Sequence, residues 1–331
     1  MKKVTFGILS TAKIGVKQVI PAMQKGQYCD ISAICSRNRE KAESIAKELG
    51  IAKAYGSYEE LLADKDLDAV YNPLPNNLHV PWTMKALEAG KHVLCEKPLA
   101  MTTEEAGDFA AYCKKFPKLK VMEAFMYRHH PQWKKAKEIV DNGGIGKLKT
   151  IQSFFSYYND DASNIRNIPE TGGGGMMDIG CYCISLSRFI FGKEPVKVCG
   201  AGQVNANFNT DVMFSGILDF DGISATFTCS TLLSPYQRVN IFGDKGRVEI
   251  IIPFNAPNDV PTELYHETSE GIEKHEFQVC DQYTLQGDSF ARSVLDDVEV
   301  LTPIEDAVAN MAVLEACLKS GREQRWVRLN A

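Results

Sequence analysis

The chain has 331 residues, of which 44% are hydrophobic and 24% are charged, and its formal net charge is -5. This is the composition of an ordinary globular protein, which excludes a collagen-like fibre, a coiled coil and a disordered tail, and the length favours two domains. The sequence has no dense block of Lys or Arg, so we expect no sequence-independent binding of nucleic acid, while local phosphate binding stays open. No apolar run approaches the roughly 18–20 residues that span a bilayer.

The N-terminus and the cysteines together predict a cytoplasmic protein. The apolar stretch 4–9 is shorter than the roughly 7–15 residues of a signal-peptide core, and no small-residue cleavage site follows it. The ten cysteines form no CxxC pair, and most of them lie within apolar segments. We therefore expect buried, reduced thiols rather than a disulfide framework.

Residues 1–123 alternate between strand and helix patterns. Strands are expected near 4–9, 31–35, 69–71, 92–95 and 120–123. Helices are expected between them, near 13–25, 39–49, 58–63, 78–89 and 103–115. Pro21 should kink or shorten the first helix. The alternation is typical of βαβ units, and it predicts an α/β Rossmann-like N-terminal domain with a parallel sheet over 1–123.

The pattern changes from residue 124. A helix near 131–142 is followed by strand patterns near 148–158, 196–206, 211–219, 223–231, 236–242 and 247–252. In 224–230, Ser and Thr alternate with Ala, Phe and Cys, which gives one apolar face and one face of small hydroxyls. Two helices close the chain, near 283–298 and 303–320. Residues 124–331 are thus predicted to form an α+β C-terminal domain with a large, mainly antiparallel, open-faced sheet.

The turn after the first strand is a candidate site for a dinucleotide. Laid on the pattern GxGxxG, the segment 10–15 reads SxAxxG and keeps only Gly15. Its place between a strand and a helix suits a dinucleotide pyrophosphate, although a plain strand-to-helix turn is the alternative. The cofactor contacts predicted here are Ser10, Thr11, Ala12, Lys13 and Ile14.

The end of the second strand indicates which cofactor is used. An acidic residue usually follows this strand when the ribose hydroxyl of NAD is held, but the chain has Cys35-Ser36-Arg37-Asn38 there. Ser36 can donate a hydrogen bond and Arg37 can hold a 2′-phosphate with its planar guanidinium. We therefore predict a preference for NADP(H) with NAD(H) as the second choice; the alternative is that Arg37 is an ordinary surface arginine.

Predicted strands are directly followed by three more segments: 72–79, 95–98 and 123–131. The ligand crevice of an open α/β sheet lies at such strand ends. Lys97 is the candidate catalytic residue among them, since Glu96 and the rigid Pro98 bracket it, although a lone lysine is more often a solvated surface residue. The residues predicted to contact the cofactor from these segments are Leu74, Asn76, His79, Glu96, Lys97 and Arg128. The adjacent His129 and His130 lack a metal-ligand spacing, so we predict no metal.

The segment 172–183 carries the second group of candidate catalytic residues. Four glycines lead into a predicted helix in which Asp178 and Tyr182 are four residues apart and share a face. A carboxylate and a phenol placed in this way can orient a substrate and donate a proton. The alternative is a core tyrosine beside a surface aspartate.

Together, the segments 10–15, 96–98 and 173–182 resemble the glucose–fructose oxidoreductase/inositol dehydrogenase/MocA (Gfo/Idh/MocA) family over nearly the whole chain. The segments 76–79, 123–128 and 178–183 are similar to its branch with dimeric dihydrodiol dehydrogenase and xylose dehydrogenase. The resemblance implies that Tyr182 is the acid/base, with Lys97 as its partner and Asp178 nearby. It also implies hydride transfer between a nicotinamide and a sugar, polyol or vicinal diol, in a homodimer formed through the sheet.

The chain departs from the family pattern at three positions. Ser10 and Ala12 replace fingerprint glycines, and Asn72 stands where a bulkier apolar residue is usual. Two other functions stay open: a nicotinamide-dependent glycosidase of the same fold, and a cofactor-binding regulator without catalysis. The regulator has no need for Lys97 and Tyr182 together, and net turnover of added cofactor would separate a dehydrogenase from the glycosidase.

Overall fold

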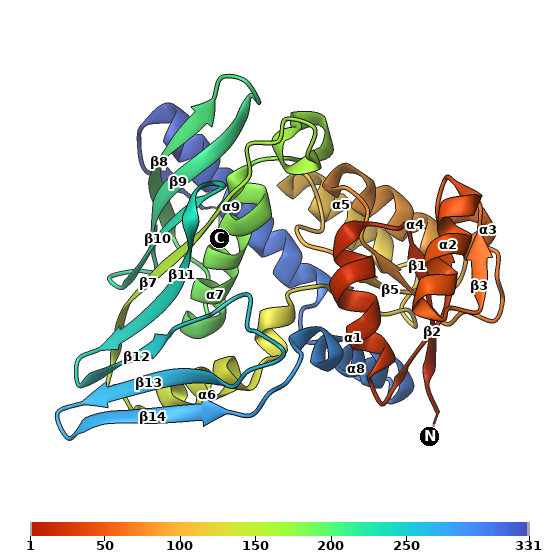
Figure 1. Cartoon of the computed structure of the whole chain (residues 1–331). Helices are drawn as coiled ribbons and strands as arrows, with labels where there is room; N and C mark the ends of the chain where they lie inside the picture. The colour runs from red at the N-terminus through yellow and green to blue at the C-terminus, as the bar shows by residue number, and fades with distance from the viewer. Residues whose placement is uncertain (1, 330–331) are drawn as a thin grey trace. The chain divides into compact units, whose positions relative to one another are not determined.

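The computed structural model describes residues 2–329, which divide into two compact units. Unit 1 contains the chain up to Met126 together with Asp281–Val308, and unit 2 contains Tyr127–Cys280 and the chain from Ala309 onward. Each unit is built on one β-sheet with helices packed against it (Figure 1).

Among the described residues, unit 1 has a six-stranded parallel sheet with the order β3-β2-β1-β4-β5-β6. Its strands are β1 (Val4–Leu9), β2 (Cys29–Cys35), β3 (Lys53–Tyr55), β4 (Ala69–Asn72), β5 (His92–Cys95) and β6 (Val121–Glu123). This confirms the predicted Rossmann-like parallel sheet. The strand order reverses between β1 and β4, and ligands of such sheets bind at this switch point, outside the carboxyl ends of the strands.

The helices of unit 1 begin and end near the residues that the sequence indicates. Helical structure runs without a break over residues 13–24, close to the predicted 13–25, and includes a π-helical turn before Pro21, so the helix is not shortened. Asn38 caps the start of α2, and Gly50, with φ of 67°, ends it. The helical segments before residue 126 are η1 (Gly15–Val19), α1 (Ile20–Gln24), α2 (Arg39–Leu49), α3 (Tyr58–Leu62), η2 (Asn76–Leu78), α4 (His79–Glu88) and α5 (Thr103–Cys113).

The predicted domain boundary differs from the structure because unit 1 takes a helix from the second half of the chain. Helices α1 and α2 cover one part of a sheet face, and α3, α4 and α5 cover the opposite face. Helix α8 (Gln282–Leu295) also packs on the first face, where the ring centroid of Phe290 lies 6.0 Å from that of Phe6 on β1. Apolar burial therefore assigns Asp281–Val308 to unit 1, whereas the sequence pattern placed all of 124–331 in one domain.

Unit 2 has a nine-stranded sheet within the described residues, with the order β14-β13-β12-β11-β7-β10-β9-β8-β15. Neighbouring strands are antiparallel except β7 and β10, which are parallel. The strands are β7 (Leu148–Tyr158), β8 (Lys197–Asn205), β9 (Thr210–Asp219), β10 (Ser224–Ser230), β11 (Leu232–Gly243), β12 (Gly246–Ile250), β13 (Thr262–Thr268), β14 (Gly271–Phe277) and β15 (Val327–Arg328).

Helices lie on one face of this sheet and leave the other face open (Figure 1). Along β10, Ala225 and Phe227 are buried while Thr226 and Thr228 are half-exposed, which confirms the predicted alternation. The remaining helical segments are η3 (Met126–His129), α6 (Pro131–Asp141), η4 (Ile165–Asn167), η5 (Pro169–Thr171), η6 (Met176–Gly180), α7 (Cys181–Phe191) and α9 (Ile304–Glu323).

In the described part of the chain, all ten cysteines are free, and seven of them are buried. This agrees with the expectation of thiols rather than a disulfide framework. Within residues 2–329, no helix has the length and apolar character that crossing a membrane requires.

Candidate active site

The turn after β1 adopts the shape of a dinucleotide-binding turn without its first glycine. Ser10 has φ of 93°, a conformation that glycine usually supplies, and its Oγ accepts a hydrogen bond from the amide of Ala12 at 3.2 Å. The helix begins directly afterwards, where the amide of Val16 donates to the carbonyl of Ala12. Ser10, Thr11, Ala12 and Ile14 are half-buried and Lys13 is exposed. The replacement of the first fingerprint glycine therefore leaves the tight turn in place.

The end of β2 offers a hydroxyl and a guanidinium. Ser36 is buried, and its Oγ accepts a hydrogen bond from the amide of Asn38 at 3.2 Å. Arg37 is exposed and lies near Tyr58; burial raises the pKa of the Tyr58 hydroxyl, and the charge of Arg37 opposes that rise. This edge of unit 1 thus presents positive charge and no carboxylate between residues 35 and 38.

His79 joins the loop after β4 to the loop after β5. Its Nε2 lies 2.7 Å from the carbonyl oxygen of Leu74, and its Nδ1 lies 2.8 Å from that of Pro98, which follows the cis peptide bond after Lys97. The ring is 1% exposed, and burial lowers its pKa to about 4. The predicted contact of His79 with a cofactor stays a prediction. The contacts of its ring connect Leu74 to Pro98, the residue after Lys97.

Asn72 has a role that sequence reasoning did not find. Its buried amide nitrogen donates to the carbonyl of His79 at 3.1 Å and to Oγ1 of Thr83 at 3.2 Å. Its oxygen accepts from the amide of Leu74 at 3.3 Å. An apolar residue here could make none of these bonds, so the departure from the family pattern fastens the loop that carries Asn76 to α4.

Two carboxylates fix the chain on either side of Lys97. Oε1 of Glu96 accepts a hydrogen bond from the hydroxyl of Tyr71 at 2.6 Å, and burial together with this carboxylate raises the pKa of that hydroxyl. Oε1 of the buried Glu123 accepts from the amide of Leu99 at 2.8 Å. Lys97 itself is half-buried at the carboxyl end of β5. Its backbone is held from both sides.

In unit 2, the glycine run is required by close packing. A Cβ on Gly173 would lie 2.6 Å from the carbonyl oxygen of Arg166, and a Cβ on Gly174 would lie 2.3 Å from Oδ1 of Asp211. Gly174 also has φ of 125°. Oδ2 of Asp211 accepts a hydrogen bond from the amide of Met176 at 2.6 Å. Asp211 thus caps the helical segment that carries Asp178 and Tyr182, a role that no local sequence signal indicates.

The titration of Asp211 provides a pH test of this cap. Burial raises its pKa from 3.8 to about 6, against the hydrogen bonds that backbone amides donate to it. The folded state therefore holds the proton more tightly than the unfolded state, so this contribution to stability is complete below the unfolded pKa and is lost as the pH rises through about 6. We expect Asp211→Asn to gain about 2 kcal/mol of unfolding free energy relative to wild type between about pH 4 and pH 6.

Asp219→Asn is the matched control on the same strand. Burial acts to raise the pKa of Asp219, but hydrogen bonds from Lys197 and from backbone amides outweigh it and lower that pKa. Its contribution to stability is thus lost as the pH falls, which is the opposite sign. Chemical denaturation at several pH values measures both variants. Parallel pH dependence of the wild type and Asp211→Asn would show that the carboxyl is not perturbed.

Asp178 is held by two side chains. Its Oδ2 accepts hydrogen bonds from the hydroxyl of Tyr157 at 2.5 Å and from Nε of Arg166 at 3.0 Å. The carboxylate raises the pKa of Arg166, and burial together with the carboxylate raises that of Tyr157. The side chain of Asp178 is only 14% exposed, so it is not a surface aspartate. Neither partner could be found from the sequence, because both lie on separate segments.

Tyr182 stands in an aromatic cluster of unit 2. It is 5% exposed, and its ring centroid lies 5.9 Å from Tyr127, 5.7 Å from Phe155 and 5.5 Å from Phe254. Aromatic packing of this kind fixes the ring and so determines where the hydroxyl lies. The cluster gives Tyr182 the rigidity that a proton donor needs, but a core tyrosine would be packed in the same way.

Arg128 fastens the start of unit 2 to α7. Its Nη2 donates to Oγ of Ser185 at 2.7 Å and to the carbonyl of Ser185 at 3.3 Å, while Tyr127 shares a hydrogen bond of 2.8 Å with the same Oγ. Arg128 is 6% exposed. Its contact with a cofactor stays a prediction. In the structure, its hydrogen bonds to Ser185 help to hold Tyr127 beside the helix that carries Tyr182.

Two family models match this chain. The model described as "Oxidoreductase family, NAD-binding Rossmann fold" matches residues 4–125, and the model described as "GFO/IDH/MocA C-terminal domain" matches residues 133–249.

Among known proteins, a D-xylose 1-dehydrogenase (NADP(+)) of Haloferax volcanii is 38% identical, with 98% of this chain and 99% of the relative covered. A trans-1,2-dihydrobenzene-1,2-diol dehydrogenase of Xenopus laevis is 33% identical, with 74% of each chain covered. Among solved structures, the 3-ketoreductase KijD10 of Actinomadura kijaniata, in complex with NADP and TDP-benzene, is 27% identical and superimposes with a TM-score of 0.90 over 96% of this chain and 98% of that one.

Proposed function

Because the chain belongs to the Gfo/Idh/MocA family of NAD(P)-binding oxidoreductases, we propose that it transfers hydride between NADP(H) and the carbonyl or hydroxyl carbon of a sugar, polyol or vicinal diol. The observation that carries the proposal is Tyr182, a buried phenol held in an aromatic cluster four residues after the fixed carboxylate of Asp178. The names of the xylose and dihydrobenzenediol dehydrogenases support the substrate class.

The edge of unit 1 fits a phosphorylated dinucleotide. The positive φ of Ser10 keeps the tight turn, and the end of β2 offers Ser36 and Arg37 in place of a carboxylate. Residues 10–14 would hold the pyrophosphate, Ser36 and Arg37 the 2′-phosphate, and Lys97 the nicotinamide ribose. When bound, NADP(H) supplies or accepts the hydride.

The side chains of this chain would handle the proton. We assign to Tyr182 the donation of its hydroxyl proton to the substrate oxygen as negative charge develops there. A tyrosine hydroxyl ordinarily titrates at about pH 10, so its reversible use near neutral pH requires a cation that stabilises the phenolate. Lys97 would supply that charge. Asp178, fixed by Arg166, would accept a hydrogen bond from a substrate hydroxyl and orient it.

A substrate panel tests the proposal. Aldoses, 1,2-diols and 2-oxo-aldehydes are incubated with the protein and either NADP⁺ or NADPH, and the near-ultraviolet absorbance of the reduced nicotinamide is followed. We expect net cofactor turnover with at least one member. Glycosides are incubated in a parallel set, where hydrolysis without net cofactor turnover would establish the glycosidase alternative instead. Cofactor binding without turnover of any substrate would favour the regulator.

Arg37 should set the preference for NADP(H). Arg37→Ala removes the charged hydrogen bonds to the 2′-phosphate, and loss of such bonds typically weakens binding by about 10–100-fold. We expect weaker NADP(H) binding and unchanged NAD(H) binding, measured by fluorescence titration. Arg39→Ala is the control, because Arg39 is also exposed but pairs with Glu60 at 2.7 Å. A wild type that prefers NAD(H), or unchanged discrimination in Arg37→Ala, would contradict the assignment.

We further propose a homodimer that is formed through the open face of the unit 2 sheet. A shallow groove of about 650 Å³ on this face is lined in part by Phe154, Ile217 and Tyr236. Ile217 is 41% exposed and Tyr236 is 50% exposed, and apolar groups gathered on a surface favour association. Light scattering should give a dimer for the wild type and a smaller species for Ile217→Asp. A wild type that is monomeric at micromolar concentration would overturn this proposal.

We also propose that the protein works in the cytoplasm. Its ten free cysteines support this location, because buried thiols persist where the environment is reducing. Fractionation of cells that express the chain tests it, and recovery of the protein outside the cytoplasmic fraction would contradict it.

A further inference from the structure

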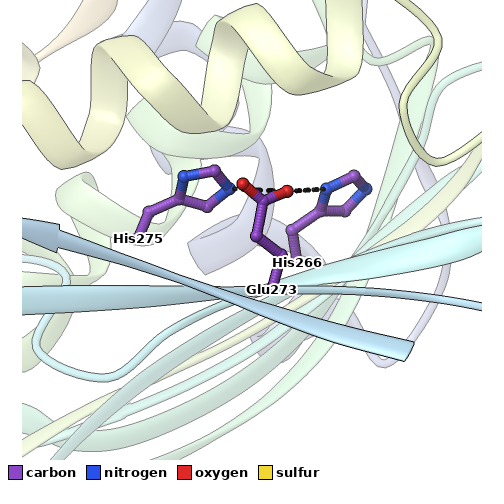
Figure 2. Close-up of side chains that lie close together, drawn as sticks. All are labelled: His266, Glu273 and His275. Carbon is purple, nitrogen blue, oxygen red and sulfur yellow. Dashed lines mark ion pairs between the residues drawn. The ribbon is translucent and has the colours of Figure 1, made fainter. Parts of the chain in front are cut away.

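Three side chains that the proposed reaction does not use meet on the hairpin of β13 and β14. His266 pairs with Glu273 across the hairpin, and His275 lies two residues further along β14. Paired residues of antiparallel strands, and residues two apart on one strand, point to the same face of a sheet. Figure 2 shows the carboxylate of Glu273 between the two imidazole rings.

The distances between these groups are too long for hydrogen bonds. Oε2 of Glu273 lies 3.8 Å from Nδ1 of His266 and 3.5 Å from Nε2 of His275, and the three ligand atoms lie within 4.8 Å of one another. A proton shared by one pair would bring nitrogen and oxygen to about 2.7–3.2 Å. A tetrahedral zinc ion, with bonds of about 2.0–2.2 Å, separates its ligand atoms by about 3.3–3.6 Å. The two nitrogen–oxygen distances are therefore close to the spacing of metal ligands.

In each of the two rings, one nitrogen is directed at the carboxylate of Glu273. Nε2 of His266 lies 3.0 Å from the carbonyl oxygen of Gly144. Because a carbonyl only accepts, Nε2 carries the hydrogen, and the neutral ring keeps its lone pair on Nδ1, which faces Glu273. Histidine ligands of metals are usually held in this way, by a hydrogen bond from the second nitrogen to a carbonyl. Nε2 of His275 is buried and makes no hydrogen bond.

The burial of the cluster suits an ion that enters from solvent. The side chains of His266 and His275 are 15% and 17% exposed, whereas that of Glu273 is 66% exposed. The imidazoles therefore form the inner wall of the cluster, and the carboxylate lies on its open side. Two imidazoles and one carboxylate suit divalent zinc, cobalt and nickel better than magnesium or calcium, which prefer oxygen ligands alone.

We propose that His266, Glu273 and His275 bind one divalent transition-metal ion of the zinc class, with water in the fourth position. The ion would join β14 to β13 and, through the Gly144 carbonyl that holds His266, to the segment after α6. The proposal concerns a site within unit 2 and does not depend on the substrate of the oxidoreductase.

Cobalt titration of the full, untagged chain after treatment with EDTA tests the site. Tetrahedral Co²⁺ absorbs visible light strongly, so the spectrum reports both binding and geometry. We expect one Co²⁺ per chain, displaced by one Zn²⁺, and a rise in melting temperature with Zn²⁺. Glu273→Gln and His275→Ala should each weaken binding by about tenfold or more. Glu276→Gln is the control, because Glu276 lies on the same strand and pairs with Lys274 instead.

Circular dichroism and NADP⁺ binding show whether each variant is folded. Weakened binding in folded Glu273→Gln and His275→Ala, with wild-type binding in Glu276→Gln, supports the site. The proposal is overturned if the wild type gives no cobalt spectrum at millimolar Co²⁺. Equal binding by all three variants would also overturn it, because the ion would then be held elsewhere, for instance by cysteines.

Discussion

Replacement of Tyr182 by phenylalanine should lower kcat by about 10²–10⁴-fold, which is the usual contribution of a positioned acid or base. The substitution removes the proton donor and keeps the ring that packs against Phe155 and Phe254. The loss should appear in kcat, because the proton moves in the transition state, and NADP(H) affinity should change little. Steady-state kinetics on the active panel substrate and a fluorescence titration measure the two effects.

Tyr265→Phe is the matched control for loss of a hydroxyl. The Tyr265 hydroxyl donates to Glu263 at 2.7 Å on β13, and the proposed reaction does not use it. We expect wild-type kcat for this variant. If Tyr182 were only a core residue, folded Tyr182→Phe would also turn over normally, and that outcome would remove the proposed mechanism.

Lys97→Met should lower both kcat and NADP(H) affinity, because the proposal gives this lysine two tasks. Loss of the charge that stabilises the phenolate should cost about 10²-fold or more in kcat. Loss of the hydrogen bond to the ribose should weaken cofactor binding by about tenfold, since hydrogen bonds to charged groups contribute about 1.5–3 kcal/mol. Kinetics and titration on the same preparation separate this double effect from the single effect expected for Tyr182→Phe.

Lys85→Met controls for removal of a lysine charge from unit 1. Lys85 lies on α4, pairs with Glu59 at 3.4 Å and stands over the ring of Trp82. It should keep wild-type kcat and cofactor affinity. Wild-type values of both quantities in folded Lys97→Met would mean that Lys97 is the solvated surface lysine of the alternative interpretation.

The parts of the fold that follow regular patterns were predictable from the sequence. The buried parallel strands of unit 1 read as short apolar runs between helical patterns, and β10 alternates with a period of two. Strands β3, β13, β14 and β15 were not predicted. Strand β14 (Gly271–Phe277) is largely exposed and rich in charged residues, so it has no apolar alternation to indicate a strand. Helix α8 has a clear helical pattern, but only the packing of Phe290 shows which sheet it covers.

The sequence allowed the residues of the candidate site to be chosen, but it did not allow the contacts between them to be predicted. Lys97 and Tyr182 could be chosen from their places after a strand and after a glycine run. The hydrogen bonds of Asn72, the cap formed by Asp211 and the pair of Asp178 with Arg166 join separate segments, so no spacing in the sequence reveals them. The adjacent His129 and His130 lack a metal-ligand spacing, and the three candidate ligands lie on the hairpin of β13 and β14 instead.

Transfer of deuterium tests the central claim most directly. A panel substrate that supports turnover is prepared with deuterium on the carbon that is oxidised, and the NADPH formed from NADP⁺ is analysed by mass spectrometry. Hydride transfer predicts that each NADPH formed carries one deuterium from the substrate. NADPH without deuterium, or conversion of the substrate with no NADPH formed, would contradict the account of this protein as an NADP(H)-dependent oxidoreductase of sugars, polyols or diols.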